Sequence, residues 1–249
     1  RFLTEMAEVT VIVMERFDIP DNNIYDDGDS VNPPATEDIP AEGYNRVVAG
    51  DEATYTVYTP EGLEAWRKEA HEGTYAGSDN TVAVINLILG ADIVLPVPAE
   101  GESNWIPVGS ASDPYDGVID GRGHTIRNMT IVSNSSEHVG FIANADNHTA
   151  GDVIFENLKF ADVNISTKGG CTGALVGFVA SEDGIIRNVH ILGGKINSTS
   201  RYTGGIVGDS SYGNAVIDNC SNSAEINGET SVGGLAGDGY VINSRNSGN

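Results

Sequence analysis

The chain has 249 residues, 39% of them hydrophobic, and a formal net charge of −23 at pH 7. Phosphate binding needs a basic surface, so this charge disfavours a nucleic-acid-binding protein. The longest apolar run is too short to cross a bilayer, and we expect no transmembrane segment. The length suits one domain with an N-terminal extension.

Residues 1–53 are expected to form that extension, an N-terminal strand followed by an acidic linker. Residues 9–14 (Val-Thr-Val-Ile-Val-Met) predict a strand, either the last strand of an upstream domain or an edge strand of the main fold. Residues 18–53, rich in Asp, Asn, Pro and Gly, predict a linker. The aspartates in this linker that could bind Ca²⁺ are Asp21, Asp26, Asp27 and Asp29. Their spacing is not that of an EF-hand, so a solvated loop is preferred. Because the chain begins with Arg1, we expect a fragment of a longer protein.

Residues 54–104 predict an N-terminal cap that contains one helix and the first strands. Thr59 is placed to cap the helix and Pro60 suits its first position. One face of this helix is apolar, with Leu63, Trp66 and Ala70 at helical spacing. Strands are predicted at residues 82–89 and 93–95. We expect the helix to cover the open first coil of the next region.

Residues 105–249 contain a block of about 30 residues that recurs four times, which is typical of a solenoid. The copies begin at Val139, Thr172, Thr203 and Val232. Each copy has short apolar runs separated by Gly, Asn, Ser and Asp, and no helical periodicity. We therefore predict an all-β fold, a right-handed parallel β-helix with three short strands per coil. The chain stops part-way through a coil, so we expect the array to be incomplete at its C-terminal end; either more repeats follow in the natural protein or this edge meets another molecule.

Apolar residues one period apart predict four buried columns. These are Phe155, Ile186, Ile217 and Val241; Leu158, Val189 and Cys220; Ile165, Ile196 and Ile226; and Ile142, Leu175, Ile206 and Leu235. In a parallel stack each column becomes a continuous line of core side chains, because neighbouring coils supply the wall that one coil lacks.

An asparagine follows the first column at a fixed position. The five residues predicted to form this ladder are Asn128, Asn157, Asn188, Asn219 and Asn243. A row of ligands is one interpretation. We prefer a structural ladder at a turn, with the amides pointing inward and bonded to one another. The residues just before them should face outward with alternating charge; they are Arg127, Glu156, Arg187 and Asp218.

Glycines recur in every copy and are expected at turn corners, where a positive φ or a close approach of coils requires them. They are Gly173, Gly177, Gly204, Gly205, Gly208, Gly233, Gly234 and Gly237. A phosphate-binding loop is not favoured, because no helix follows these glycines and no Gly-Lys-Ser/Thr sequence occurs.

No residue is predicted to be catalytic or to bind a cofactor. His124 lies near Asp120 and Arg122, but Asp-Gly-x-Gly-His-Thr-Ile is more typical of a tight turn entering a strand. Cys171 and Cys220 fall on different faces, so we expect neither a disulfide nor a zinc site.

The remaining candidate metal ligands are Asp113, Asp116 and Asp120, which could bind Ca²⁺. Such an acidic cluster resembles the calcium sites of β-helical lyases. Those sites work with an Arg or Lys base on a neighbouring coil, and no such base is identified in this sequence. We therefore expect no metal site.

The runs at residues 173–177, 204–208 and 233–237, each followed by apolar-x-Asn, resemble the GLUG motif. With the Asp-Gly-Arg-Gly-His-Thr-Ile element, this resemblance covers about residues 105–249. It is similar to the repeat regions of secreted or surface-anchored bacterial proteins, including adhesin-like proteins of gut Bacteroides and some IgA-peptidase-type proteins. The resemblance implies an extracellular or cell-surface β-helix, anchored to the outer membrane through a missing N-terminus if it is anchored at all.

We expect an adhesin-like protein that binds a host or matrix glycan or protein and has no catalytic activity. A polysaccharide lyase or glycoside hydrolase is the first alternative. A passive stalk of a larger surface protein is the second.

Overall fold

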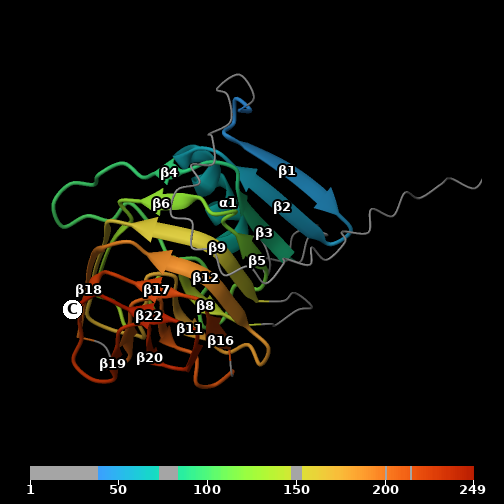
Figure 1. The fold of residues 1–249 in the computed structure, drawn as a ribbon. Coiled ribbons are helices and arrows are strands. Elements are labelled where there is room, and N and C mark those ends of the chain that lie inside the picture. Colours follow the sequence, from blue (N-terminus) through green and yellow to red (C-terminus); the bar gives the residue numbers. More distant parts are fainter. Residues whose placement is uncertain (1–38, 73–83, 147–152, 200, 214) are drawn as a thin grey trace, which may run out of the picture. The chain divides into compact units, whose positions relative to one another are not determined.

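The computed structural model describes residues 39–72, 84–146, 153–199, 201–213 and 215–249 (Figure 1). The predicted strand at residues 9–14 and the linker aspartates lie outside these residues. Everything below concerns the compact unit that contains the described residues.

The described elements are one helix and a series of mostly short strands: β1 (Tyr44–Ala49), β2 (Glu52–Val57), α1 (Pro60–Glu72), β3 (Val84–Leu89), β4 (Ile93–Val94), β5 (Val118–Asp120), β6 (Thr125–Arg127), β7 (Thr130–Ser133), β8 (Ile142–Ala145), β9 (Ile154–Ala161), β10 (Val163–Thr167), β11 (Val176–Val179), β12 (Ile185–Ile191), β13 (Gly194–Ser198), β14 (Thr203–Gly204), β15 (Val207–Asp209), β16 (Val216–Asp218), β17 (Ser221–Asn222), β18 (Glu225–Asn227), β19 (Val232–Gly233), β20 (Ala236–Asp238), β21 (Tyr240–Ile242) and β22 (Arg245–Asn246).

These strands stack as the coils of a parallel β-solenoid of about 5 turns. The largest sheet runs β1-β2-β3-β5-β9-β12-β16-β21, and Figure 1 shows its strands side by side. A second face is β7-β10-β13-β18 and a third is β8-β11-β15-β20. The predicted fold class is confirmed, including three strand-bearing faces per coil.

Three of the four predicted core columns are confirmed by the strand register. Phe155, Ile186, Ile217 and Val241 are neighbours on successive coils, with Ile119 ahead of Phe155. The Leu158 column and the Ile165 column align in the same way. In the first column Phe155, Ile186 and Ile217 are fully buried, whereas Ile226 at the end of the third column is only partly buried. Val241 is 39% exposed, because β21 is the edge of its sheet among the described residues.

The fourth column was predicted one residue out of register in its first copy. Ile142 pairs with Val176, which pairs with Val207, so Phe141 is the residue aligned with Leu175. Phe141, Ile142, Leu175 and Val176 are all fully buried. Burial on both sides of the chain removes the inside–outside alternation that would have fixed the register.

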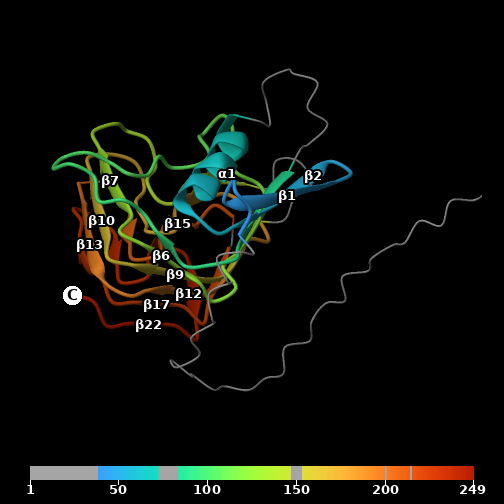
Figure 2. The same ribbon diagram turned by 90° about the horizontal axis from the view of Figure 1, so that it is seen from above.

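Helix α1 caps the solenoid as predicted. The Thr59 Oγ1 accepts a hydrogen bond from the Gly62 amide at 3.2 Å, which satisfies an unpaired donor of the first turn. Leu63 and Trp66 are fully buried. The Trp66 indole stacks on Phe141, with ring centroids 5.6 Å apart and 10° between planes. Figure 2 shows α1 over the interior of the coils.

The start of the cap lies earlier than predicted. Residues 44–53, assigned to the linker, form β1 and the beginning of β2, an antiparallel hairpin that joins the main sheet through β3. Tyr55 and Val57 of β2 turn inward and are buried. The Arg46 Nε donates to Glu69 of α1 at 2.9 Å, and the Tyr55 hydroxyl donates to the same carboxylate. These contacts tie the hairpin to the helix.

The repeated glycines permit close packing and are not positive-φ corners. None of the eight has a positive φ. A Cβ on Gly208 would lie 2.4 Å from the Gly177 carbonyl oxygen and 2.5 Å from the Thr172 amide nitrogen. The small ladder through Thr172, Thr203 and Val232 therefore packs directly against the β8-β11-β15-β20 sheet. The predicted close approach is confirmed and the predicted corner conformation is wrong.

Candidate functional site

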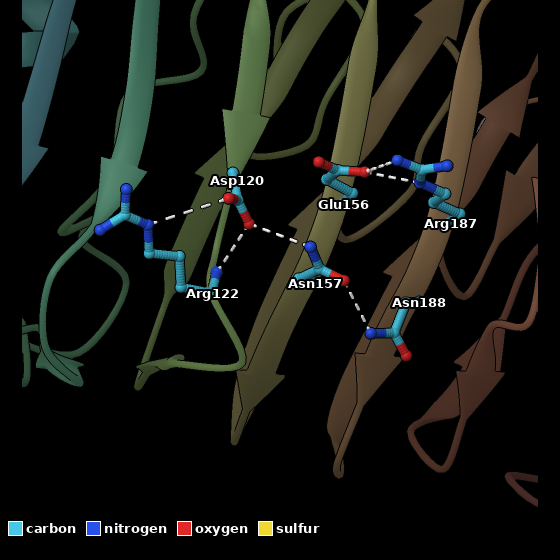
Figure 3. A network of polar contacts seen from close by, with 6 residues as sticks. All are labelled: Asp120, Arg122, Glu156, Asn157, Arg187 and Asn188. Atoms are coloured by element: carbon cyan, nitrogen blue, oxygen red, sulfur yellow. Dashed lines mark hydrogen bonds and ion pairs between the residues drawn. The ribbon is translucent and has the colours of Figure 1, made fainter. Parts of the chain in front are cut away.

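The asparagine ladder is a chain of amide hydrogen bonds across the main sheet (Figure 3). The Asn188 Nδ2 donates to the Asn157 Oδ1 at 2.8 Å, and the Asn157 Nδ2 donates to the Asp120 Oδ1 at 3.1 Å. The Asn219 Nδ2 donates to the Asn188 Oδ1 at 3.5 Å. Each amide donates to the coil before it, so the ladder joins successive coils.

Backbone conformation explains why these positions are asparagine. Asn157, Asn188, Asn219 and Asn243 all have φ between 47° and 55°. Among residues with a side chain, asparagine adopts this left-handed region most readily. The kink also corrects the predicted direction of the side chains. It interrupts the strand alternation, so the amides are half-buried or exposed and the following residue, such as Val189, faces the core.

Asn128 does not belong to this ladder. Its backbone amide donates to the Ala161 carbonyl, which places it beside Asp162 at a second corner. Asn128 and Asp162 both have positive φ, 62° and 57°. The Asp120 carboxylate accepts the hydrogen bond from Asn157 that an asparagine of the preceding coil was predicted to accept. This is because β5 pairs with the first half of β9 and β6 pairs with the second half. The prediction that Asn128 starts the ladder is therefore wrong.

Substitution of Asn188 should separate the two roles of this residue. Asn188→Ala should lower the free energy of unfolding by about 1–2 kcal/mol, because alanine tolerates the left-handed conformation poorly and makes no amide bonds. Asn188→Gly should cost less, since glycine adopts a positive φ freely. Urea unfolding of both variants measures this difference. Equal losses in the two variants would contradict a backbone role for Asn188.

The outward charges pair along the same sheet, but in a different order from the prediction. Glu156 and Arg187 form an ion pair one coil apart, as expected, with the Arg187 Nη2 at 2.5 Å from the Glu156 Oε2. Arg127 aligns with Ala161 and pairs with Asp162 at 3.7 Å, so it is not opposite Glu156. Asp120 is opposite Glu156 instead. The alternation of sign therefore holds from Glu156 onward and fails above it.

Charge reversal at Arg187 tests the contribution of this pair. Arg187→Glu places a carboxylate between Glu156 and Asp218. The expected loss is up to about 1 kcal/mol at low salt, because the pair is partly exposed. Thermal unfolding at low salt and at about 1 M NaCl, where the Debye length is about 3 Å, should show the loss shrinking. A salt-independent loss would instead indicate lost packing of the arginine stem.

The Asp120–His124 segment forms the predicted tight turn. Arg122 and Gly123 have positive φ values of 48° and 81°, and the Arg122 amide donates to the Asp120 Oδ1 at 2.9 Å. The His124 ring is buried, with its Nδ1 at 3.3 Å from the Asp92 Oδ1. Asp92 also accepts from the Thr125 amide. These bonds hold the turn onto the preceding coil.

The three candidate calcium ligands do not form a common site. Asp120 is committed to the ladder and the turn. The Asp113 backbone amide donates to the Ser110 Oγ at 3.1 Å, and Asp116 is buried. Among the described residues, no group of three or more His, Cys, Asp or Glu side chains is arranged to hold a metal ion.

Both cysteines, Cys171 and Cys220, are free and buried. Cys220 occupies the Leu158 and Val189 column, as predicted. Burial raises the pKa of the Cys171 thiol to about 12 and that of the Cys220 thiol to about 11. Both thiols therefore stay protonated and unreactive near neutral pH.

A pocket of about 340 Å³ lies between residues 103–110 and residues 131–139. Its buried lining residues include Trp105, Ile131 and Val139, and the exposed Ile106 adds a solvent-facing wall. The Trp105 indole donates to the Phe141 carbonyl at 3.0 Å, so this part of the lining is fixed.

Polar side chains complete the pocket. His71 contributes from the last turn of α1, and Glu137 and His138 contribute from the loop after β7. The His138 Nδ1 accepts the Cys171 amide at 2.8 Å. Burial, the largest cause, lowers the pKa of His138, while the nearby Glu137 and Asp209 act to raise it. A neutral imidazole at neutral pH is the form that fits this hydrogen bond.

The sequence did not predict this pocket. Its residues come from the end of α1, the loop before β5, strand β7 and the loop before β8, and no motif links these segments. Concave sites with apolar walls and a few fixed polar groups are the usual form of ligand sites, which makes this pocket the candidate functional site.

No family model, curated protein or solved structure matches this chain. The part of the chain that the structure describes contains no helix long and apolar enough to span a membrane.

Proposed function

We propose that this protein is an exported, adhesin-like surface protein that binds an extracellular glycan or protein and carries out no catalysis. The observation that carries this proposal is the pocket beside residues 103–110, which combines an apolar wall with the fixed imidazole of His138 and the exposed Glu137 carboxylate. The repeats that resemble the GLUG motif and the strongly acidic composition support an extracellular setting.

The asparagine ladder and the ion pair beside it hold the coils together, so a binding site is expected elsewhere on the molecule. The Asn157 and Asn188 amides bond to each other, and Glu156 and Arg187 neutralise each other. Side chains committed to such contacts hold coils together and are not available for acid–base chemistry. Binding is therefore assigned to the pocket and not to the repeat motif.

A polysaccharide lyase or hydrolase is the second candidate. Its supporting observation is that His71, Glu137 and His138 line one pocket, since imidazoles and carboxylates are the usual general acids and bases. A passive stalk is the third reading of the same solenoid.

A glycan and protein array probed with the purified chain, together with a lyase assay on uronic-acid polymers with and without Ca²⁺, separates these functions. Saturable binding without product formation supports the adhesin. Release of unsaturated sugars would replace it with the lyase. If neither binding nor turnover is detected, the passive stalk is the function that remains.

A further inference from the structure

The pocket has dimensions suited to one small ring. Its volume of about 340 Å³ lies near the lower end of the range of about 300–1,000 Å³ for small-molecule sites. The apolar wall is the exposed Ile106 side chain, backed by the buried Trp105, Ile131 and Val139. A pyranose ring has an apolar face of C–H groups that would pack on such a wall.

Donors and acceptors at the pocket match the hydroxyl edge of such a ring. Because the His138 Nδ1 accepts the Cys171 amide, the neutral imidazole carries its hydrogen on Nε2 and can donate there. The Glu137 side chain is exposed beside it and offers two acceptor oxygens. Hydrogen bonds to an ionised carboxylate are stronger than those between neutral groups.

A row of aromatic rings leads from the pocket across successive coils. The His138 ring stacks on Phe178 of β11, with centroids 5.0 Å apart and 14° between planes. The Phe178 ring lies next to that of Tyr212, which follows β15, with the ring centroids 5.8 Å apart. Tyr212 is 79% exposed. Coils in this stack are about 4.8 Å apart, a step comparable in length to one sugar unit, so the row can support a chain of sugars.

Charge selects among sugars. The chain carries a net charge of −23, and the carboxylate that lines the pocket is that of the exposed Glu137. Both repel uronic acids and other anionic sugars. A neutral sugar meets no such repulsion.

We propose that this pocket binds the terminal neutral pyranose of a glycan, and that Phe178 and Tyr212 support the sugar units that follow. This inference rests on the proposed binding function and names its site and its ligand class.

The test is calorimetric titration of the full chain with galactose, glucose and mannose, with neutral oligosaccharides that end in each, and with a matching uronic-acid oligosaccharide. Glu137→Gln and Ile106→Ser should each weaken binding of the preferred neutral sugar, Glu137→Gln by about tenfold, the effect of losing a hydrogen bond to a charged group. Tyr212→Ala should weaken oligosaccharide binding by about three- to tenfold, the value of one aromatic contact, and leave the monosaccharide unchanged.

Leu192→Ser is the matched control, since Leu192 is an exposed aliphatic residue that does not line the pocket. It should bind every sugar as the parent does, and all variants should keep the parental melting temperature. Parental affinity in both Glu137→Gln and Ile106→Ser would overturn the assigned site. Preference for the uronic acid would overturn the ligand class.

The two proposals fail in different ways. If only a protein or an acidic glycan binds, the inference about the pocket is overturned and the adhesin proposal stands. If no ligand binds in the array, both are overturned.

Discussion

Replacing Phe141 with alanine should lower the free energy of unfolding by about 4 kcal/mol, the loss typical of a buried aromatic residue. Phe141 is fully buried and lies in contact with both tryptophans. Its ring stacks on Trp105 at 4.5 Å and on Trp66 at 5.6 Å, and it meets Phe160 edge-on at 5.5 Å. Removing it takes away one contact between the cap helix and the coils and leaves a cavity.

Urea unfolding followed by tryptophan fluorescence measures this loss, since Trp66 and Trp105 are the two tryptophans of the chain. Val97→Ala is the control, because Val97 is 81% exposed, and its cost should be close to zero. A loss below about 1 kcal/mol in Phe141→Ala would mean that this aromatic cluster does not join cap and solenoid.

Replacing Gly208 with valine should destabilise the protein by about 3 kcal/mol or more, because overpacking against backbone cannot be relieved by a rotamer change. A Cβ at this position would meet the Gly177 oxygen, the Thr172 nitrogen and the Cys171 carbonyl carbon, all at 2.8 Å or less. These are atoms of the neighbouring coil, so the two ladders would have to separate.

Gly101→Ala is the matched control for this steric effect. Gly101 has a φ of 79° and no atom within 4 Å of the added Cβ, so only backbone strain of about 1 kcal/mol is expected. Thermal unfolding of the two variants should therefore differ clearly. Similar losses would show that the ladders are not packed as closely as the structure has them.

The core columns were predictable because their spacing is nearly constant. Phe155, Ile186 and Ile217 occupy the same place in successive copies, and the register aligns them as expected. The register of the Phe141 and Ile142 pair was not predictable, because both residues are apolar and both are buried. Where a chain is buried on both sides, its sequence carries no alternation to fix the register.

The top of the asparagine ladder was misplaced for a different reason. The coil of β9 and β10 has two corners with a left-handed residue, one at Asn157 and one at Asp162. Asn128 has the residue type suited to either corner. The turn at residues 121–124 lengthens the coil and moves Asn128 to the second corner, so that Asp120 aligns with Glu156 and bonds to Asn157. The repeat motif does not show how many residues this turn takes up, so it could not show which corner Asn128 reaches.

The pocket was beyond prediction because its parts are far apart in sequence. Trp105 lies near a coil start, His71 ends the cap helix, and His138 precedes a strand. Their meeting depends on how the helix and two loops fold over the coil. The repeat pattern fixes the coils and leaves those loops undetermined.

Disulfide formation between neighbouring coils tests the stacking of the solenoid most directly. Asn164 on β10 and Lys195 on β13 are register partners with exposed side chains. Partners on parallel strands are about 4.8 Å apart, within the range of about 4.4–6.8 Å that a disulfide spans. The native Cys171 and Cys220 are buried thiols with pKa values raised to about 12 and 11, so they do not compete.

Asn164→Cys combined with Lys195→Cys should cross-link under mild oxidation. Asn164→Cys combined with Asn197→Cys should stay reduced, because that pair is about 8 Å apart, beyond the reach of a disulfide. Cross-linking of the second pair and not the first would contradict the stacked register on which the core, the ladders and the pocket all depend.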